Sequence, residues 1–153
     1  MRSLGAALGR AMPAIRDTPV VVTIKGELGA GKTTLVSGVL HALGIDGPIR
    51  SPTYTLIEPY ETPQLQVYHM DLYRLADAGE IEPLGIRDLL TPAAVLLIEW
   101  PERAAAALPP ADITLSIQYG SLEHGGAEAR RLIALPMSAA GQHLVQALFG
   151  VQA

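Results

Sequence analysis

The sequence contains no cysteine and no asparagine, and its only lysines are Lys25 and Lys32. Without cysteine there can be no disulfide and no thiolate metal site, which suits a reducing compartment, so we expect a cytoplasmic protein. Guanine-nucleotide switches read their base with an N-K-x-D motif, which a chain without asparagine cannot supply. No apolar run approaches the length of a transmembrane helix, so no membrane association is expected.

Positive charge is also scarce, since the formal net charge is −4. Contacts with nucleic-acid phosphates need clustered Lys and Arg, so direct RNA binding is not expected. Tyr54, Tyr68 and Tyr73 are not predicted to form a stacking platform interleaved with basic residues, which points the same way. No pair of histidines has the spacing of metal ligands, and we expect no zinc site.

What the chain does have is apolar residues, at 49% against 17% charged residues. This balance is typical of a compact globular core rather than a disordered chain. A length of 153 residues suits one domain, and neither an internal repeat nor a long linker divides it. We therefore predict a single domain over residues 1–153.

The most specific motif runs from Gly26 to Thr34 and fits the pattern G-x-x-x-x-G-K-[ST]. Small residues let such a loop curl until successive backbone N–H groups surround one phosphate. The following helix adds the positive end of its dipole. Lys32 is predicted to reach the β- and γ-phosphates, and the Thr33 hydroxyl is placed to ligate Mg²⁺.

The surroundings of this loop support a nucleotide site. Val20 to Ile24 is a β-branched run of the kind found in buried parallel strands. After the loop, apolar residues recur at helical spacing until Gly44, where a glycine would end the helix. Strand, glycine-rich loop and helix is the order that the motif requires.

Periodicity and turn residues predict the other elements. Leu4, Leu8, Met12 and Ile15 share one face of a predicted first helix. The further predicted strands are Thr53–Ile57, Leu65–Asp71, Val95–Ile98, Ile113–Ile117 and Arg131–Leu135. The further predicted helices are Leu75–Leu90, broken at Pro83 and Gly85, then Arg103–Leu108 and Ser138–Phe149. Together they predict an α/β fold, a single P-loop NTPase-like domain whose sheet is mostly parallel with an antiparallel part and is flanked by helices.

A phosphate loop needs an acidic partner at the end of a buried strand, and two residues qualify. Glu99 follows a wholly apolar strand, so we assign it to Mg²⁺. Asp71 follows an alternating strand, so we assign it to orienting water or sensing the γ-phosphate. The two roles could be exchanged. His69 lies on the same strand face as Asp71, and a functional role and a purely structural one both stay open.

Four motifs occur in order: Gly26–Thr34, then Ser51-Pro52-Thr53-Tyr54, then His69-Met70-Asp71-Leu72-Tyr73-Arg74, then Ile98-Glu99-Trp100-Pro101-Glu102. In these motifs the chain closely resembles the TsaE (YjeE) family, the bacterial ATPase of the pathway that places threonylcarbamoyladenosine in tRNA. The resemblance implies slow ATP hydrolysis that becomes productive with the partners TsaB and TsaD.

The resemblance also implies roles for particular residues, with ATP or ADP and Mg²⁺ as the cofactors. Lys32, Asp71 and Glu99 are expected to serve hydrolysis, with Thr33 and Glu99 on the metal. The segment from Ser51 to Thr55 is expected to respond to the γ-phosphate, and one of Arg130 and Arg131, here taken as Arg131, to reach the nucleotide. The expected nucleotide contacts are Leu28, Gly29, Ala30, Gly31, Lys32, Thr33, Thr34, Ser51, Thr53, Thr55, Asp71, Trp100 and Arg131.

Two other functions fit the motif. A small-molecule P-loop kinase has this length and loop, although kinases usually bring several arginines over the transferred phosphoryl group. The second alternative is a binding module that holds ADP and hydrolyses hardly any ATP. Phosphate release, measured with and without partners, separates them from an ATPase.

Overall fold

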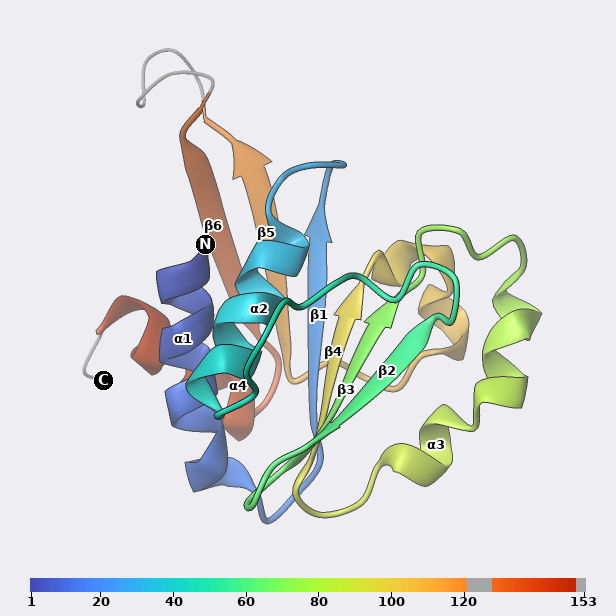
Figure 1. Cartoon of the computed structure of the whole chain (residues 1–153), viewed down its shortest axis with the longest axis horizontal. Coiled ribbons are helices and arrows are strands. Elements are labelled where there is room, and N and C mark those ends of the chain that lie inside the picture. Colours follow the sequence, from blue (N-terminus) through green and yellow to red (C-terminus); the bar gives the residue numbers. More distant parts are fainter. Residues whose placement is uncertain (121–127, 151–153) are drawn as a thin grey trace.

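A computed structural model describes residues 1–120 and 128–150, and within them the strands form one six-stranded sheet. The order across the sheet is β2-β3-β4-β1-β5-β6 (Figure 1). The strands are β1 (Val20–Gly26), β2 (Ile57–Glu61), β3 (Gln66–Asp71), β4 (Ala94–Glu99), β5 (Ile113–Tyr119) and β6 (Arg130–Pro136). The α-helices are α1 (Arg2–Ala11), α2 (Lys32–Ala42), α3 (Ile86–Leu89) and α4 (Ala139–Phe149). Short 3₁₀ helices span Met12–Ile15 (η1), Ala78–Leu84 (η2), Pro101–Arg103 (η3) and Ala105–Ala107 (η4).

The sheet is parallel in its centre and antiparallel at both edges. β3, β4, β1 and β5 run parallel, while β2 pairs antiparallel with β3 and β6 with β5. The predicted α/β fold with a mixed sheet is therefore confirmed. The carboxyl ends of β1, β3 and β4 meet at one edge, the position where ligands bind in open α/β sheets.

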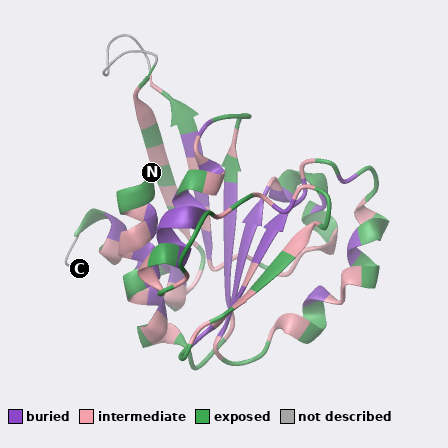
Figure 2. Ribbon diagram, in the orientation of Figure 1, coloured by how far each residue is buried: buried purple, intermediate pink, exposed green. Residues whose placement is uncertain are grey.

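Alternation along the central strands divides the core into two layers. In β1, Val20, Val22 and Ile24 face α1, α2 and α4, while Val21 faces the layer of η2, α3 and η4 (Figure 1). Both sides of these strands are covered, so they are buried along most of their length (Figure 2). This double burial explains why β1 and β4 appear in the sequence as continuous apolar runs.

Helices α1 and α2 pack backbone to backbone where glycines lie at their contact. A Cβ atom at Gly5 would overlap the carbonyl oxygen of Leu35, and one at Gly38 would overlap that of Arg2. The obstacle is backbone in both cases, so the helices would have to separate to admit a methyl group. The amphipathic first helix predicted from Leu8 and Met12 is thereby fixed against the helix that begins at the phosphate loop.

The predicted strand Thr53–Ile57 is wrong. The backbone of this segment turns instead, with Leu56 N donating to Pro52 O at 2.8 Å and Leu56 at a φ of 65°. The strand begins at Ile57, where the predicted strand was expected to end, and it includes Pro59. Pro59 is tolerated because β2 is an edge strand, where a missing N–H costs no ladder bond.

The predicted helix Arg103–Leu108 is also wrong, since two 3₁₀ turns, η3 and η4, take its place. Ala104 lies between them with a φ of −146°, buried at 2% exposure. A short alanine run cannot hold an α-helix once one member is turned into the core. The predicted helix Leu75–Leu90 is broken at Gly85 as expected, because Gly85 has a φ of 63° between η2 and α3. The break predicted at Pro83 is wrong, since Pro83 lies inside η2, which begins only at Ala78.

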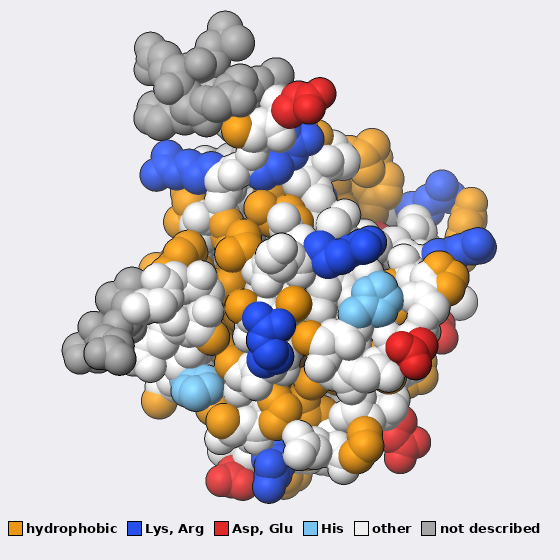
Figure 3. All heavy atoms as spheres, turned by 60° about the vertical axis from the view of Figure 1, so that its left-hand side comes forward, with side chains coloured by type: hydrophobic (Ala, Val, Ile, Leu, Met, Phe, Trp, Pro, Cys, Tyr) orange, Lys and Arg blue, Asp and Glu red, His pale blue; other side chains and the backbone are white. Residues whose placement is uncertain are grey.

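The surface over the helices is mixed in character. On the face shown in Figure 3, Lys and Arg side chains stand among neutral and hydrophobic ones rather than in one continuous basic patch. Among the described residues, no helix has both the length and the apolar character needed to cross a membrane.

Candidate functional site

A cavity of about 490 Å³ lies where β1, β3 and β4 end and α2 begins. Its walls come from all four sequence motifs, which are far apart along the chain. The lining residues are Leu28, Gly29, Gly31, Lys32, Thr33, Thr34, Ser51, Thr53, Asp71, Tyr73, Arg74, Glu99 and Trp100. The topology thus gathers the motifs into a single pocket.

The phosphate loop connects β1 to α2 and turns sharply at its glycines. Gly26, Gly29 and Gly31 have φ values of 155°, 77° and 108°, a region that residues with a Cβ rarely adopt. Gly31 is the N-cap of α2, so the free N–H groups of the first helical turn open toward the cavity. This arrangement suits a bound anion.

Lys32 lies across the loop rather than in solvent. Its Nζ donates to the carbonyl oxygens of Gly26 at 2.6 Å and of Glu27 at 2.8 Å. The same ammonium group lies 4.2 Å from the centre of the Trp100 ring. Two of its three hydrogens are therefore directed by the loop backbone, and one is left for a ligand.

The charge of Lys32 is only partly compensated. Burial lowers the pKa of its ammonium group, and the carboxylates of Glu99, Asp71 and Glu102 act in the opposite direction without restoring it. A buried cation whose pKa is lowered by desolvation gains most from a further negative group nearby. A phosphate bound on the loop is such a group.

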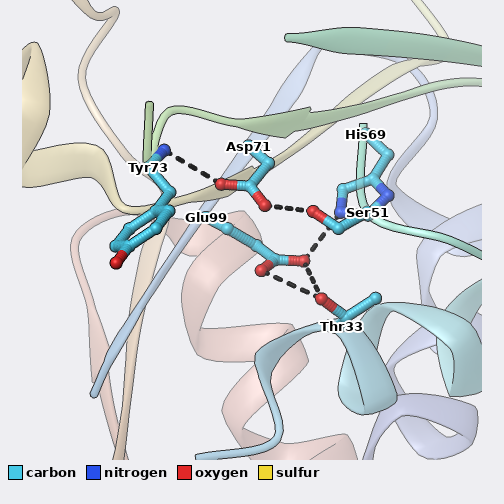
Figure 4. Close-up of polar contacts among 6 residues, drawn as sticks. All are labelled: Thr33, Ser51, His69, Asp71, Tyr73 and Glu99. Atoms are coloured by element: carbon cyan, nitrogen blue, oxygen red, sulfur yellow. Dashed lines mark hydrogen bonds and ion pairs between the residues drawn. The ribbon is translucent and has the colours of Figure 1, made fainter. Parts of the chain in front are cut away.

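Glu99 ends β4, beside the loop strand, as its apolar run predicted. Its register partner on β1 is Ile24, and the residue is 2% exposed. Thr33 Oγ1 lies 2.9 Å from Glu99 Oε1 and 3.1 Å from Oε2, so it donates to the carboxylate (Figure 4). On the other side, His69 Nε2 lies 2.8 Å from Oε1.

Asp71 ends β3 as the register partner of Glu99 and is 5% exposed. One carboxylate oxygen accepts from the Ser51 hydroxyl, and the other from Tyr73 N at 3.0 Å (Figure 4). Asp71 N in turn donates to Leu56 O at 3.0 Å. Asp71 therefore joins the segment Ser51–Thr55 to the sheet.

Arginine side chains lie against aromatic rings on and beside the cavity wall. Arg74 lies over the Tyr54 ring at 4.6 Å, and Arg103 lies 5.6 Å from the Tyr73 ring and 5.9 Å from that of Trp100. The sequence was not expected to form a stacking platform of tyrosines and basic residues, and these single arginine–ring pairs at Tyr54 and Tyr73 were not predicted. The reason is tertiary, because the parallel ends of β3 and β4 bring two distant turns together.

Comparison with known proteins identifies the family of the chain. The family model described as "Threonylcarbamoyl adenosine biosynthesis protein TsaE" matches residues 1–131. The chain belongs to the TsaE family.

Individual TsaE relatives cover most of the chain. The protein named tRNA threonylcarbamoyladenosine biosynthesis protein TsaE of Haemophilus influenzae is 41% identical over 131 residues, covering 86% of this chain and 79% of the relative. The protein of the same name from Treponema pallidum is 39% identical over 114 residues, covering 74% and 81%. The crystal structure of Bacillus subtilis YdiB, at 26% identity, superposes with a TM-score of 0.71 over 97% of this chain and 88% of that one.

Most of the residues predicted to contact a nucleotide in this TsaE-family chain line the cavity. Ala30, Thr55 and Arg131 are not among the lining residues. Ala30 is buried at 1% exposure beneath the loop. The lining also includes Tyr73 and Arg74, which the sequence analysis quoted within a motif but did not assign to the site. Their place directly after Asp71 was the available signal.

The two adjacent arginines of β6 point to opposite faces, as their position on a strand requires. Arg130 pairs in register with Tyr119, and its guanidinium lies 4.1 Å from the centre of the Tyr119 ring. Tyr119 donates its hydroxyl to Leu28 O at 2.9 Å, so Arg130 is on the side of the phosphate loop. Arg131 is exposed and pairs with Gln118, and its role at a nucleotide stays a prediction.

The donor atoms at the centre of the TsaE pocket suit a hard cation. Thr33 offers a hydroxyl oxygen and Glu99 a carboxylate, the ligand types that Mg²⁺ takes when phosphates and water complete its shell. The direct contact between these side chains places their oxygens within the span that one ion could bridge. The residues present therefore fit Mg²⁺ bound together with a nucleotide.

Proposed function

We propose that the chain binds Mg-ATP in this pocket and hydrolyses it, in support of threonylcarbamoyladenosine formation in tRNA. The observation that carries the proposal is the contact of Thr33 with Glu99 beside the buried Lys32. A loop cation, a hydroxyl ligand and a strand-end carboxylate are the parts that P-loop nucleotide hydrolases use. They meet here within one cavity.

Phosphate binding falls to the loop and the start of α2. Lys32 is positioned by Gly26 O and Glu27 O, so its remaining hydrogen is available for the β- or γ-phosphate. The N–H groups of the first turn of α2 would bind the other phosphate oxygens. Thr33 and Glu99 would hold Mg²⁺, which neutralises charge on the phosphates when bound.

Asp71 is the residue we assign to the attacking water. It is buried beside Glu99 but not bonded to Thr33, and its two oxygens are held by Ser51 and Tyr73 N. Exchanging the Ser51 bond for a bond to water would let the carboxylate orient that water toward the γ-phosphate. The same exchange would release the segment Ser51–Thr55, so hydrolysis and loop position would be coupled.

Partners follow from the family rather than from the pocket. Relatives are named for tRNA threonylcarbamoyladenosine biosynthesis. The partnership with TsaB and TsaD is what the resemblance of the motifs implies. We infer that hydrolysis is slow in the isolated chain and productive when TsaB and TsaD are bound. Direct contact with tRNA is not part of the proposal, in keeping with the net charge of −4.

The test is phosphate release from ATP, measured for the chain alone and after addition of TsaB and TsaD, with Lys32→Ala as the inactive control. Release that rises with the partners and is absent in the variant supports the proposal. ADP retained without release indicates a binding module instead. Transfer of the γ-phosphate to a small molecule, with no free phosphate, indicates the kinase alternative.

A further inference from the structure

His69 is a buried polar residue to which the proposed hydrolysis assigns no role. It lies on β3, two residues before Asp71, and is 0% exposed. Its Nε2 contacts Glu99 Oε1 at 2.8 Å, whereas its Nδ1 has no hydrogen-bond partner among the described residues (Figure 4). A core position that served packing alone would favour an apolar side chain, because an unpaired buried nitrogen is costly.

The contact with Glu99 determines which ring nitrogen carries the proton. An ionised carboxylate can only accept, so Nε2 is protonated and donates to Oε1. Nδ1 has no partner in the described part of the chain, so the ring offers Glu99 a single donor, Nε2–H.

The two oxygens of Glu99 are consequently unequal. Oε1 accepts from both His69 and Thr33, whereas within the described part of the chain Oε2 accepts only from Thr33, at the longer distance of 3.1 Å. The Thr33 hydroxyl has a single hydrogen, so if it ligated an ion through a lone pair it would still donate at most one full bond to Glu99. The bond from His69 does not depend on that hydroxyl and would continue to hold Oε1.

We infer that His69 is a positioning residue that fixes the Glu99 carboxylate by holding Oε1, so that Oε2 faces the Mg²⁺ ion shared with Thr33 and the nucleotide. This rests on the proposed function, in which Glu99 serves the metal. Partners that hold a ligating carboxylate from behind usually matter for metal affinity by about 10- to 100-fold. His69 acts through Glu99 and touches neither substrate nor ion.

Three variants separate positioning from packing. His69→Leu keeps the apolar volume and removes the donor, His69→Gln places an amide nitrogen near the position of Nε2, and His69→Asn carries its amide one carbon too short to reach Glu99. His143→Gln on α4 is the control, because His143 bonds to Ala11 O away from the cavity. Binding of an unhydrolysable ATP analogue is measured by calorimetry without metal and over a range of Mg²⁺ concentrations, and folding by the cooperativity of thermal unfolding.

We expect His69→Leu and His69→Asn to need about 10- to 100-fold more Mg²⁺ for half-maximal enhancement of binding, with metal-free affinity unchanged. His69→Gln and His143→Gln should resemble the wild type. If His69→Leu does not fold, the comparison of Gln with Asn decides. Equal magnesium dependence in Gln and Asn, or an unchanged dependence in folded His69→Leu, overturns the inference. If nucleotide binding by the wild-type chain does not depend on Mg²⁺, the result refutes the proposed function itself, on which the inference about His69 rests.

Discussion

Replacing Lys32 by alanine should remove most of the affinity for ATP. At an effective dielectric constant of about 20, a unit charge 4 Å away contributes about 4 kcal/mol. That corresponds to about a thousandfold in dissociation constant. No second lysine can substitute, because Lys25, the other lysine of the chain, is exposed on β1 and does not line the cavity. The dipole of α2 remains, but its contribution of about 0.3–1 kcal/mol is too small to compensate.

Calorimetry with an unhydrolysable ATP analogue measures this loss, and Lys25→Ala is the matched control with the same change of charge. Burial lowers the pKa of Lys32, which means that the pocket without a ligand disfavours the charged form of this side chain. Its removal should therefore leave the melting temperature of the free protein close to that of the wild type. A loss of affinity below tenfold, or an equal loss in Lys25→Ala, would refute the assigned role of the loop.

Three further outcomes are expected. Glu99→Gln should weaken the magnesium dependence of nucleotide binding, whereas Asp71→Asn should bind Mg-ATP nearly normally and lose turnover about a hundredfold; calorimetry and phosphate release that give the opposite pattern would exchange the two roles. Gly38→Ala should lower the melting temperature, because a Cβ at this position overlaps the carbonyl oxygen of Arg2. Overpacking of this kind costs about 1–3 kcal/mol, whereas alanine gains ~1 kcal/mol over glycine in helix propensity. A higher melting temperature would show that the two helices can separate freely. A Mg-ATP analogue at about a hundred times its dissociation constant should stabilise the fold by about 2.7 kcal/mol, and ATP should displace it better than GTP; an unmoved melting curve would argue against a nucleotide site.

The parts of the fold that depend on local patterns could be predicted from the sequence. The apolar run ending at Glu99 required a strand buried on both faces, and such a strand belongs beside the loop strand, where it lies. The alternation before Asp71 likewise predicted the strand β3, which lies beside β4 and pairs antiparallel with β2. Phosphate-loop chemistry named Lys32 and Thr33 because the spacing itself encodes their geometry.

The predictions that were wrong or left open concern residues whose structure depends on contacts between distant segments. The run Thr53–Ile57 alternates like a strand, but a turn closed by Pro52 O and the bond from Asp71 N to Leu56 O hold it otherwise. The local sequence contains no pattern that predicts those hydrogen bonds. His69 was left undecided for the same reason, because its partner Glu99 is thirty residues away.

The mouth of the pocket shows the same limit. Arg103 meets Tyr73 only because β3 and β4 end side by side in register. The spacing of aromatic and basic residues along the chain therefore gave no indication of the cluster they form.

The most direct test of the central claim is a crystal structure with Mg²⁺ and an unhydrolysable ATP analogue. We expect the phosphates on the loop Gly26–Thr34, the Thr33 hydroxyl on the ion, and Glu99 in contact with the ion or with one of its waters. Lys32 should lie against the β- and γ-phosphates. A nucleotide bound elsewhere, or a metal ion held without Thr33 and Glu99, would contradict the account.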